Sequence, residues 1–91
     1  MAKRPTNEEL ADLTRRVTWV RAYRAELYAI IRASERSIAL LKELENLDTG
    51  AIDTFQATIA TTRNQVEIAG SWLLQNEERL YRWTKMISDN R

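Results

Sequence analysis

The sequence contains no cysteine and no histidine, and these two absences exclude much of the chemistry that proteins carry out. Without cysteine there is no disulfide framework, no thiolate zinc site and no cysteine nucleophile. Without histidine the commonest metal ligand and general base is missing as well. Phosphate-binding glycine loops, serine-hydrolase elbows and zinc-protease motifs are also absent from the sequence. We therefore expect a protein that is not an enzyme and that holds neither a metal nor a cofactor.

Glycine and proline are scarce too, with two glycines and one proline in 91 residues, too few for a fold rich in turns between short strands. The longest apolar runs, such as 28–31 and 38–41, are far too short to cross a membrane, and none follows the charged start as in a signal peptide. The net charge of +1 gives no general bias toward nucleic acid or anionic membranes. We expect a cytoplasmic protein without a membrane partner.

Apolar residues recur in alternating steps of three and four over two long stretches, which is the heptad pattern of a coiled-coil helix with one packing seam. The first seam consists of Leu10, Leu13, Val17, Val20, Arg24, Leu27, Ile31, Ser34, Ile38 and Leu41. The second consists of Ile52, Phe55, Ile59, Thr62, Val66, Ala69, Leu73, Asn76, Leu80, Trp83 and Ile87. Tyr23, Ile30 and Leu44 lie beside the first seam, and we expect them to widen it.

The chain is predicted to be one all-α domain, residues 1–91, folded as a long antiparallel helical hairpin of two helices of about 40 residues. After a flexible N-terminus at 1–6, the first helix is predicted over 7–46, with Thr6 or Asn7 as its cap.

The turn is predicted at 47–50, within the Asn-Leu-Asp-Thr-Gly cluster at 46–50, and the second helix over 51–89. In an alternative three-helix fold, the second helix breaks near 64–71, because threonines weaken the helix before it and Gly70-Ser71 allows a kink.

In this hairpin, residue i of the first helix lies opposite residue 98 − i of the second. The polar seam residues then form two shared layers, one with Arg24 and Asn76 and one with Ser34 and Thr62. Such layers either fix the register or mark a point, at Arg24, where the seam opens to solvent or ligand. The same register gathers most aromatic and arginine side chains in the half away from the turn, which we call the open half.

Two groups of residues are candidates for binding. Arginine and tyrosine suit the recognition of phosphates, carboxylates and acidic protein surfaces. The candidate partner or ligand site therefore consists of Trp19, Arg21, Arg24, Tyr28, Arg32, Arg79 and Arg82. The alternative is a solvated face, partly neutralised by Glu26 and Glu35.

The second group would hold copies of the chain together. Small residues let another helix approach closely, and apolar residues off a seam usually have a partner. The candidate oligomer contact consists of Ala22, Ala25, Ala29, Ala33 and Trp72, with Ile68 also off the second seam. The alternative is that alanine is present because it favours helices.

These features favour a non-enzymatic, oligomeric protein-binding or assembly module, a dimer or larger helical bundle that acts through helical surfaces on a protein partner. Small adaptors, inhibitors, structural subunits and virus- or plasmid-encoded accessory proteins have this appearance. The alternative function is binding of nucleic acid, or of a phosphorylated, nucleotide or other anionic small ligand, through the open half. That alternative predicts a steep dependence of binding on salt.

Overall fold

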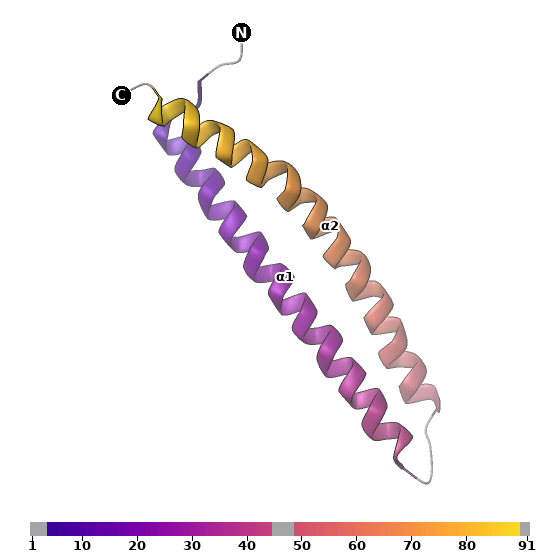
Figure 1. Ribbon diagram of the computed structural model, residues 1–91. Helices are drawn as coiled ribbons and strands as arrows, with labels where there is room; N and C mark the ends of the chain where they lie inside the picture. The colour runs from indigo at the N-terminus through magenta and orange to yellow at the C-terminus, as the bar shows by residue number, and fades with distance from the viewer. Residues whose placement is uncertain (1–3, 45–48, 90–91) are drawn as a thin grey trace.

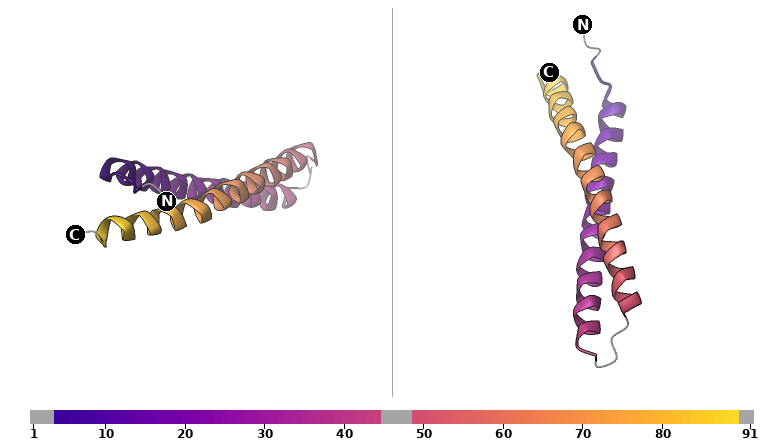
Figure 2. Two further views of the ribbon diagram at one scale, coloured as in Figure 1. Left: turned by 90° about the horizontal axis from the view of Figure 1, so that it is seen from above. Right: turned by 90° about the vertical axis from the view of Figure 1, so that its right-hand side faces the viewer.

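The computed structural model describes residues 4–44 and 49–89, which form an antiparallel hairpin of two long helices. Helix α1 spans Asn7–Lys42 and helix α2 spans Thr49–Ser88. The start of α1 and the end of α2 lie at the same end of a thin rod of 68 × 19 × 15 Å (Figure 1). The two helices cross one another along the rod (Figure 2). The predicted all-α helical hairpin is therefore confirmed.

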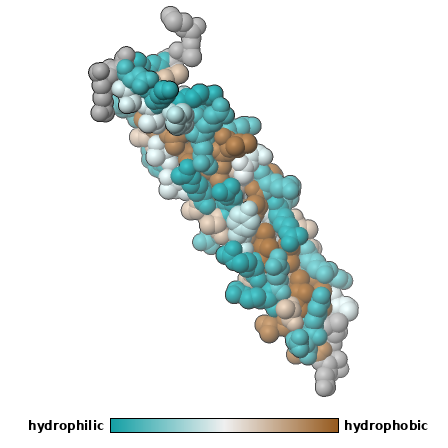
Figure 3. Space-filling view, viewed as in Figure 1, coloured by the Kyte–Doolittle hydropathy of each residue, from teal (hydrophilic) through white to brown (hydrophobic). Residues whose placement is uncertain are grey.

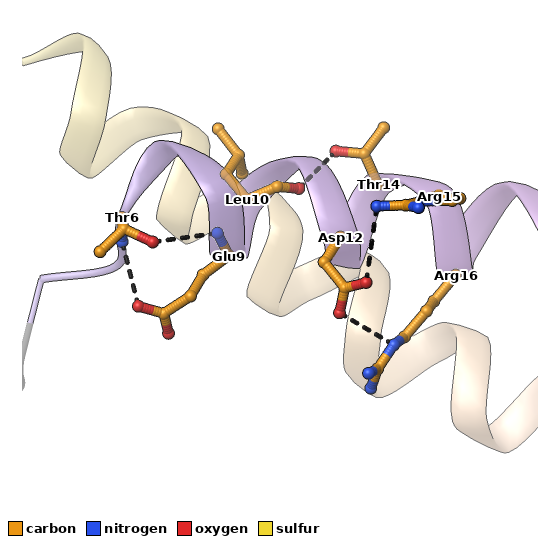
Figure 4. Close-up of polar contacts among 7 residues, drawn as sticks. All are labelled: Thr6, Glu9, Leu10, Asp12, Thr14, Arg15 and Arg16. Carbon is orange, nitrogen blue, oxygen red and sulfur yellow. Dashed lines mark hydrogen bonds and ion pairs between the residues drawn. The ribbon is translucent and has the colours of Figure 1, made fainter.

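A capping box fixes the start of α1. The Thr6 hydroxyl accepts a hydrogen bond from the Glu9 backbone N–H at 3.0 Å, and the Thr6 backbone N–H donates to Glu9 Oε1 at 3.3 Å (Figure 4). These bonds pair two backbone donors that would otherwise be unsatisfied at a helix end. Of the two predicted caps, Thr6 is the one that the structure uses.

The end of α1 comes earlier than predicted. The helix stops at Lys42 instead of residue 46, and the Glu43 and Leu44 backbone N–H groups donate to the carbonyls three residues before them, at 3.1 and 3.2 Å. Bonds of this spacing tighten the last turn of a helix. Residues 45–48, which include part of the predicted turn, lie outside the described residues.

Helix α2 begins at Thr49, two residues before the predicted start, and continues without interruption through Gly70 and Ser71 to Ser88. The three-helix alternative is therefore wrong. Three threonine hydroxyls in its first half donate to carbonyls four residues earlier: Thr54 to Gly50 at 3.0 Å, Thr58 to Thr54 at 3.1 Å and Thr62 to Thr58 at 2.7 Å. Because these hydroxyls are satisfied locally, they do not compete for the backbone in a way that breaks the helix.

The core follows the two predicted seams, because every residue on them is buried or half-buried. Val17 and Leu73 are the most deeply buried, each 1% exposed, and they form a cluster with Leu13. The half-buried Val20, Trp72, Leu80 and Trp83 pack against this cluster, which lies in the open half of the rod.

The expected widening of the first seam is not observed. Tyr23, Ile30 and Leu44 are all exposed. Two helices make one narrow contact strip, so residues beside the strip remain in solvent unless a third helix covers them.

The predicted register is confirmed by two ion pairs between the helices. Arg21 pairs with Glu77 at 2.9 Å and Arg63 with Glu35 at 3.4 Å, and in each pair residue i meets residue 98 − i. In the predicted polar layers, Ser34 and Thr62 are buried, while Arg24 and Asn76 are half-buried. Within the described residues, every wholly buried side-chain nitrogen or oxygen has a hydrogen-bond partner.

Candidate interaction surface

The two sides of the seam differ in chemistry. Arg21 and Glu35 on α1 are fourteen residues apart, which is four helical turns, so both point to the same side of the rod. Their ion pairs with Glu77 and Arg63 join the helices on that side, which we call the ion-pair side. Arg21, Glu35 and Arg63 are exposed and Glu77 is half-buried, so each pair stabilises the fold by at most about 1 kcal/mol.

The other side of the seam is hollowed near the open end of the rod. A cleft of about 290 Å³ lies there between the helices. It is lined by Glu9, Asp12, Leu13 and Arg16 of α1 and by Trp72, Asn76, Arg79 and Trp83 of α2.

The cleft combines an apolar floor with paired charges at its rim. Asp12 holds Arg16 at 3.0 Å and Arg15 at 3.7 Å (Figure 4). The Arg79 guanidinium lies 6.0 Å from the centre of the Trp83 ring, at the outer limit of a cation–π contact. With both carboxylates and guanidinium groups at its rim, the cleft suits an apolar guest with a polar edge better than a free anion.

A row of apolar side chains continues from the cleft toward the middle of the rod. From Asp12 and Arg16, steps of three and four residues along α1 lead to Trp19, Tyr23, the exposed Glu26 and Ile30. On α2, Ile68 lies one turn before Trp72, and the register places it level with Ile30. We call Trp19, Tyr23, Ile30, Ile68 and Trp72 the apolar face.

The apolar face is mostly open to solvent. Trp19 is 70% exposed and Ile68 is 64% exposed, whereas Trp72 is half-buried against the core. Figure 3 shows how apolar groups reach the surface along the rod between hydrophilic ones. Because exposed apolar patches of this kind are uncommon on monomeric proteins, the apolar face is the strongest candidate for an interaction surface.

The predicted partner or ligand site is divided by the fold. Trp19 belongs to the apolar face and Arg79 lines the cleft, while Arg82 pairs with Glu78 at 3.5 Å. Of the four remaining members, Arg21, Tyr28 and Arg32 follow the ion-pair side of α1, and Arg24 lies at the seam.

Arg24 is the member with an unusual environment. It is half-buried at the seam, and it forms no hydrogen bond or ion pair with any residue in the described ranges. Its Nη1 atom lies 4.0 Å from the position that a Cβ atom would take at Gly70. This distance is ordinary van der Waals contact, so the guanidinium packs beside α2 at Gly70.

The predicted oligomer contact is also divided. Ala22, Ala25, Ala29 and Ala33 are exposed on α1 away from the seam. Trp72 instead lines the cleft on α2 and packs against the core cluster. These five residues do not form one surface.

Sequence reasoning assigned Tyr23 and Ile30 to the core and so missed the apolar face. A second heptad stripe on α1 could have indicated this face. It contains Trp19, Tyr23, Ile30, Leu40 and Leu44. Leu74, which is also exposed, belongs to neither stripe.

Two searches of the described residues gave negative results. Over residues 4–44 and 49–89, no three or more acidic side chains are grouped so that they could hold a metal ion. Neither α1 nor α2, as described, has a stretch that is long and apolar enough to span a membrane.

No family model, curated protein or solved structure matches this chain.

Proposed function

We propose that this chain is a non-enzymatic binding or assembly module that acts in the cytoplasm by applying one face of its helical hairpin to another protein surface. The observation that carries the proposal is the contrast between a thin core and an apolar exterior. Val17 and Leu73 are the most deeply buried side chains, while Trp19, Ile68 and other large apolar groups remain exposed. A rod of this kind gains stability when a second surface covers those groups.

The chemistry of the apolar face supports a protein as the partner. Tryptophan and tyrosine are enriched at the centres of protein interfaces, where their rings lose water over a large area. The face contains Trp19, Tyr23 and Trp72, and the branched side chains of Ile30 and Ile68 surround them. None of these five side chains carries a charge, although the exposed Glu26 lies between Tyr23 and Ile30 on the same stripe of α1.

Site-specific photo-crosslinking tests this function. A benzophenone amino acid replaces Trp19 on the apolar face, and a matched variant carries it at the exposed Arg36 of the same helix. Irradiation in the organism that encodes the protein should give a protein adduct from position 19 and little from position 36. Equal adducts from both positions, or none from position 19, would overturn the proposal.

The alternative function, binding of nucleic acid or a phosphorylated ligand, is favoured by Arg24, the half-buried guanidinium without a partner in the described ranges. It is weakened because Arg21 and Arg82 are already paired with carboxylates. This alternative predicts that Arg24→Glu abolishes binding to single-stranded DNA or to a polyphosphate. Equal binding by the wild type and Arg24→Glu would exclude it.

A further inference from the structure

We propose that the apolar face pairs with the apolar face of a second copy of this chain. The two rods lie antiparallel, and the two-fold axis crosses the middle of α1. This inference rests on the proposed function and names its partner and geometry. Its support comes from the position of the face along the rod, the area that it offers and the charges at the two ends.

The apolar face is placed symmetrically on α1. Trp19 lies twelve residues after the first residue of the helix, and Ile30 lies twelve residues before its last. A two-fold axis through the midpoint of α1 therefore places Trp19 of each copy opposite Ile30 of the other. Tyr23 and Glu26 are related in the same way, so the Tyr23 hydroxyl can donate to the Glu26 carboxylate across the axis.

The area that a stable dimer needs favours this position of the axis. The broad face of the rod measures 68 × 19 Å, or about 1,300 Å², whereas a stable interface buries roughly 800 Å² on each partner. Because this rectangle is roughly the most that one rod can offer, two rods that overlap by half, with about 650 Å² each, fall short of the required area, whereas two rods that overlap along their whole length can reach it. An axis through the middle of the rod gives the complete overlap.

The charges at the two ends of the rod favour the antiparallel direction. The described residues at the open end, 4–20 and 78–89, carry six basic and five acidic side chains. The described residues at the other end, 37–44 and 49–60, carry one basic and two acidic side chains. Antiparallel pairing places ends of opposite sign against each other twice, while parallel pairing places like charges together.

The same arrangement supplies a guest for the cleft. Leu40 is 70% exposed on the heptad stripe that continues the apolar face, and it lies two residues before the end of α1. Glu9 lies two residues after the start of α1 and lines the cleft. Leu40 of the second copy therefore reaches the level of the cleft, where Leu13 and Trp83 offer it an apolar floor.

The first experiment measures the mass in solution by size-exclusion chromatography with light scattering. Ile30 on the apolar face and Tyr28 on the ion-pair side are 44% and 45% exposed, so their glutamate variants form a matched pair. The wild type and Tyr28→Glu should both have about twice the chain mass of 10.6 kDa. Ile30→Glu should remain helical by circular dichroism but have the monomer mass, with dimerisation at least about 100-fold weaker, because the axis buries the new charge twice.

Two results would overturn the inference at this stage. One is a wild type that stays monomeric at 100 µM, and the other is a Tyr28→Glu variant that dissociates as readily as Ile30→Glu. A monomeric wild type whose position 19 crosslinks to a different protein would refute self-pairing and leave the proposed function standing. The absence of any crosslink from position 19 would refute both.

The second experiment measures the direction of pairing. Because the sequence has no cysteine, a Lys42→Cys variant carries a single spin label. In the antiparallel dimer the two labels are separated along the rod by the length of α1, about 50 Å at 1.5 Å per residue. In a parallel dimer they are separated by the thickness of two rods, each 15 Å, which is about 30 Å. A pulsed electron–electron distance near 50 Å is expected, and one below about 40 Å would overturn the antiparallel arrangement.

Discussion

Replacement of Gly70 by alanine should stabilise the hairpin. Gly70 lies in the interior of α2, and no glycine in the described ranges has a positive φ, so alanine can adopt its backbone conformation without strain. A Cβ atom at this position would meet the Arg24 Nη1 atom at 4.0 Å, which is ordinary van der Waals contact at the end of a flexible side chain. The substitution therefore removes the conformational freedom of glycine without a steric penalty.

The size of the effect follows from helix propensity. Glycine in a helix interior costs about 0.8–1.0 kcal/mol relative to alanine. Gly70→Ala should therefore raise the free energy of unfolding by about 1 kcal/mol. This corresponds to an increase in Tm of roughly 4–8 °C for a domain of this size. Urea unfolding followed by circular dichroism at 222 nm, at one fixed protein concentration, measures the change.

A reverse substitution in the same helix is the control for Gly70→Ala. Ala60 is exposed in α2, and Ala60→Gly should lower the free energy of unfolding by about the same amount. The reasoning would be refuted if Gly70→Ala destabilised the protein while Ala60→Gly behaved as expected. That result would show that a methyl group at position 70 disturbs Arg24, although the 4.0 Å separation leaves room for one.

The remaining predictions concern the core, the helix cap and an ion pair. Leu73→Ala should lower the free energy of unfolding, measured in urea, by about 2–5 kcal/mol, and Leu74→Ala should lower it by less than about 0.5 kcal/mol. The difference is expected because these neighbours are 1% and 75% exposed, and equal losses would contradict the assigned seam. Thr6→Ala should cost about 1 kcal/mol through loss of the capping box, and an unchanged Tm would show that the cap is not used. A double-mutant cycle on Arg21 and Glu77 should give a coupling below about 1 kcal/mol that falls in 1 M salt; a larger, salt-independent value would contradict the exposure of this pair.

The sequence predicted the seam residues and the register completely, for a physical reason. A helix buries one stripe, and heptad spacing identifies that stripe without knowledge of its partner. The register then follows from the position of the connection, and the pairing of Arg21 with Glu77 agrees with it. Both properties depend on spacing alone, which a single sequence displays in full.

The end of α1 and the apolar face could not be predicted in the same way. Neither glycine nor proline marks Lys42 as the last helical residue, because the helix ends by a tightening of backbone bonds that any sequence can form. Tyr23 and Ile30 resemble core residues in composition, and their exposure depends on the absence of a third helix. The pairing of Arg21 depends on a carboxylate 56 residues away, that of Glu77.

The location of the tightest packing also has a consequence for how the chain folds. Val17 and Leu73, which are buried best, are 56 residues apart in the sequence and lie far from the connection. The entropy lost on loop closure grows with loop length, so contacts near residues 44 and 49 can form early, and those between Val17 and Leu73 come late. The hairpin is therefore expected to close from the connection outward, and its best-buried cluster forms late. Until that cluster forms, the open ends of the two helices are not packed against each other, and their tryptophan rings are exposed to other molecules.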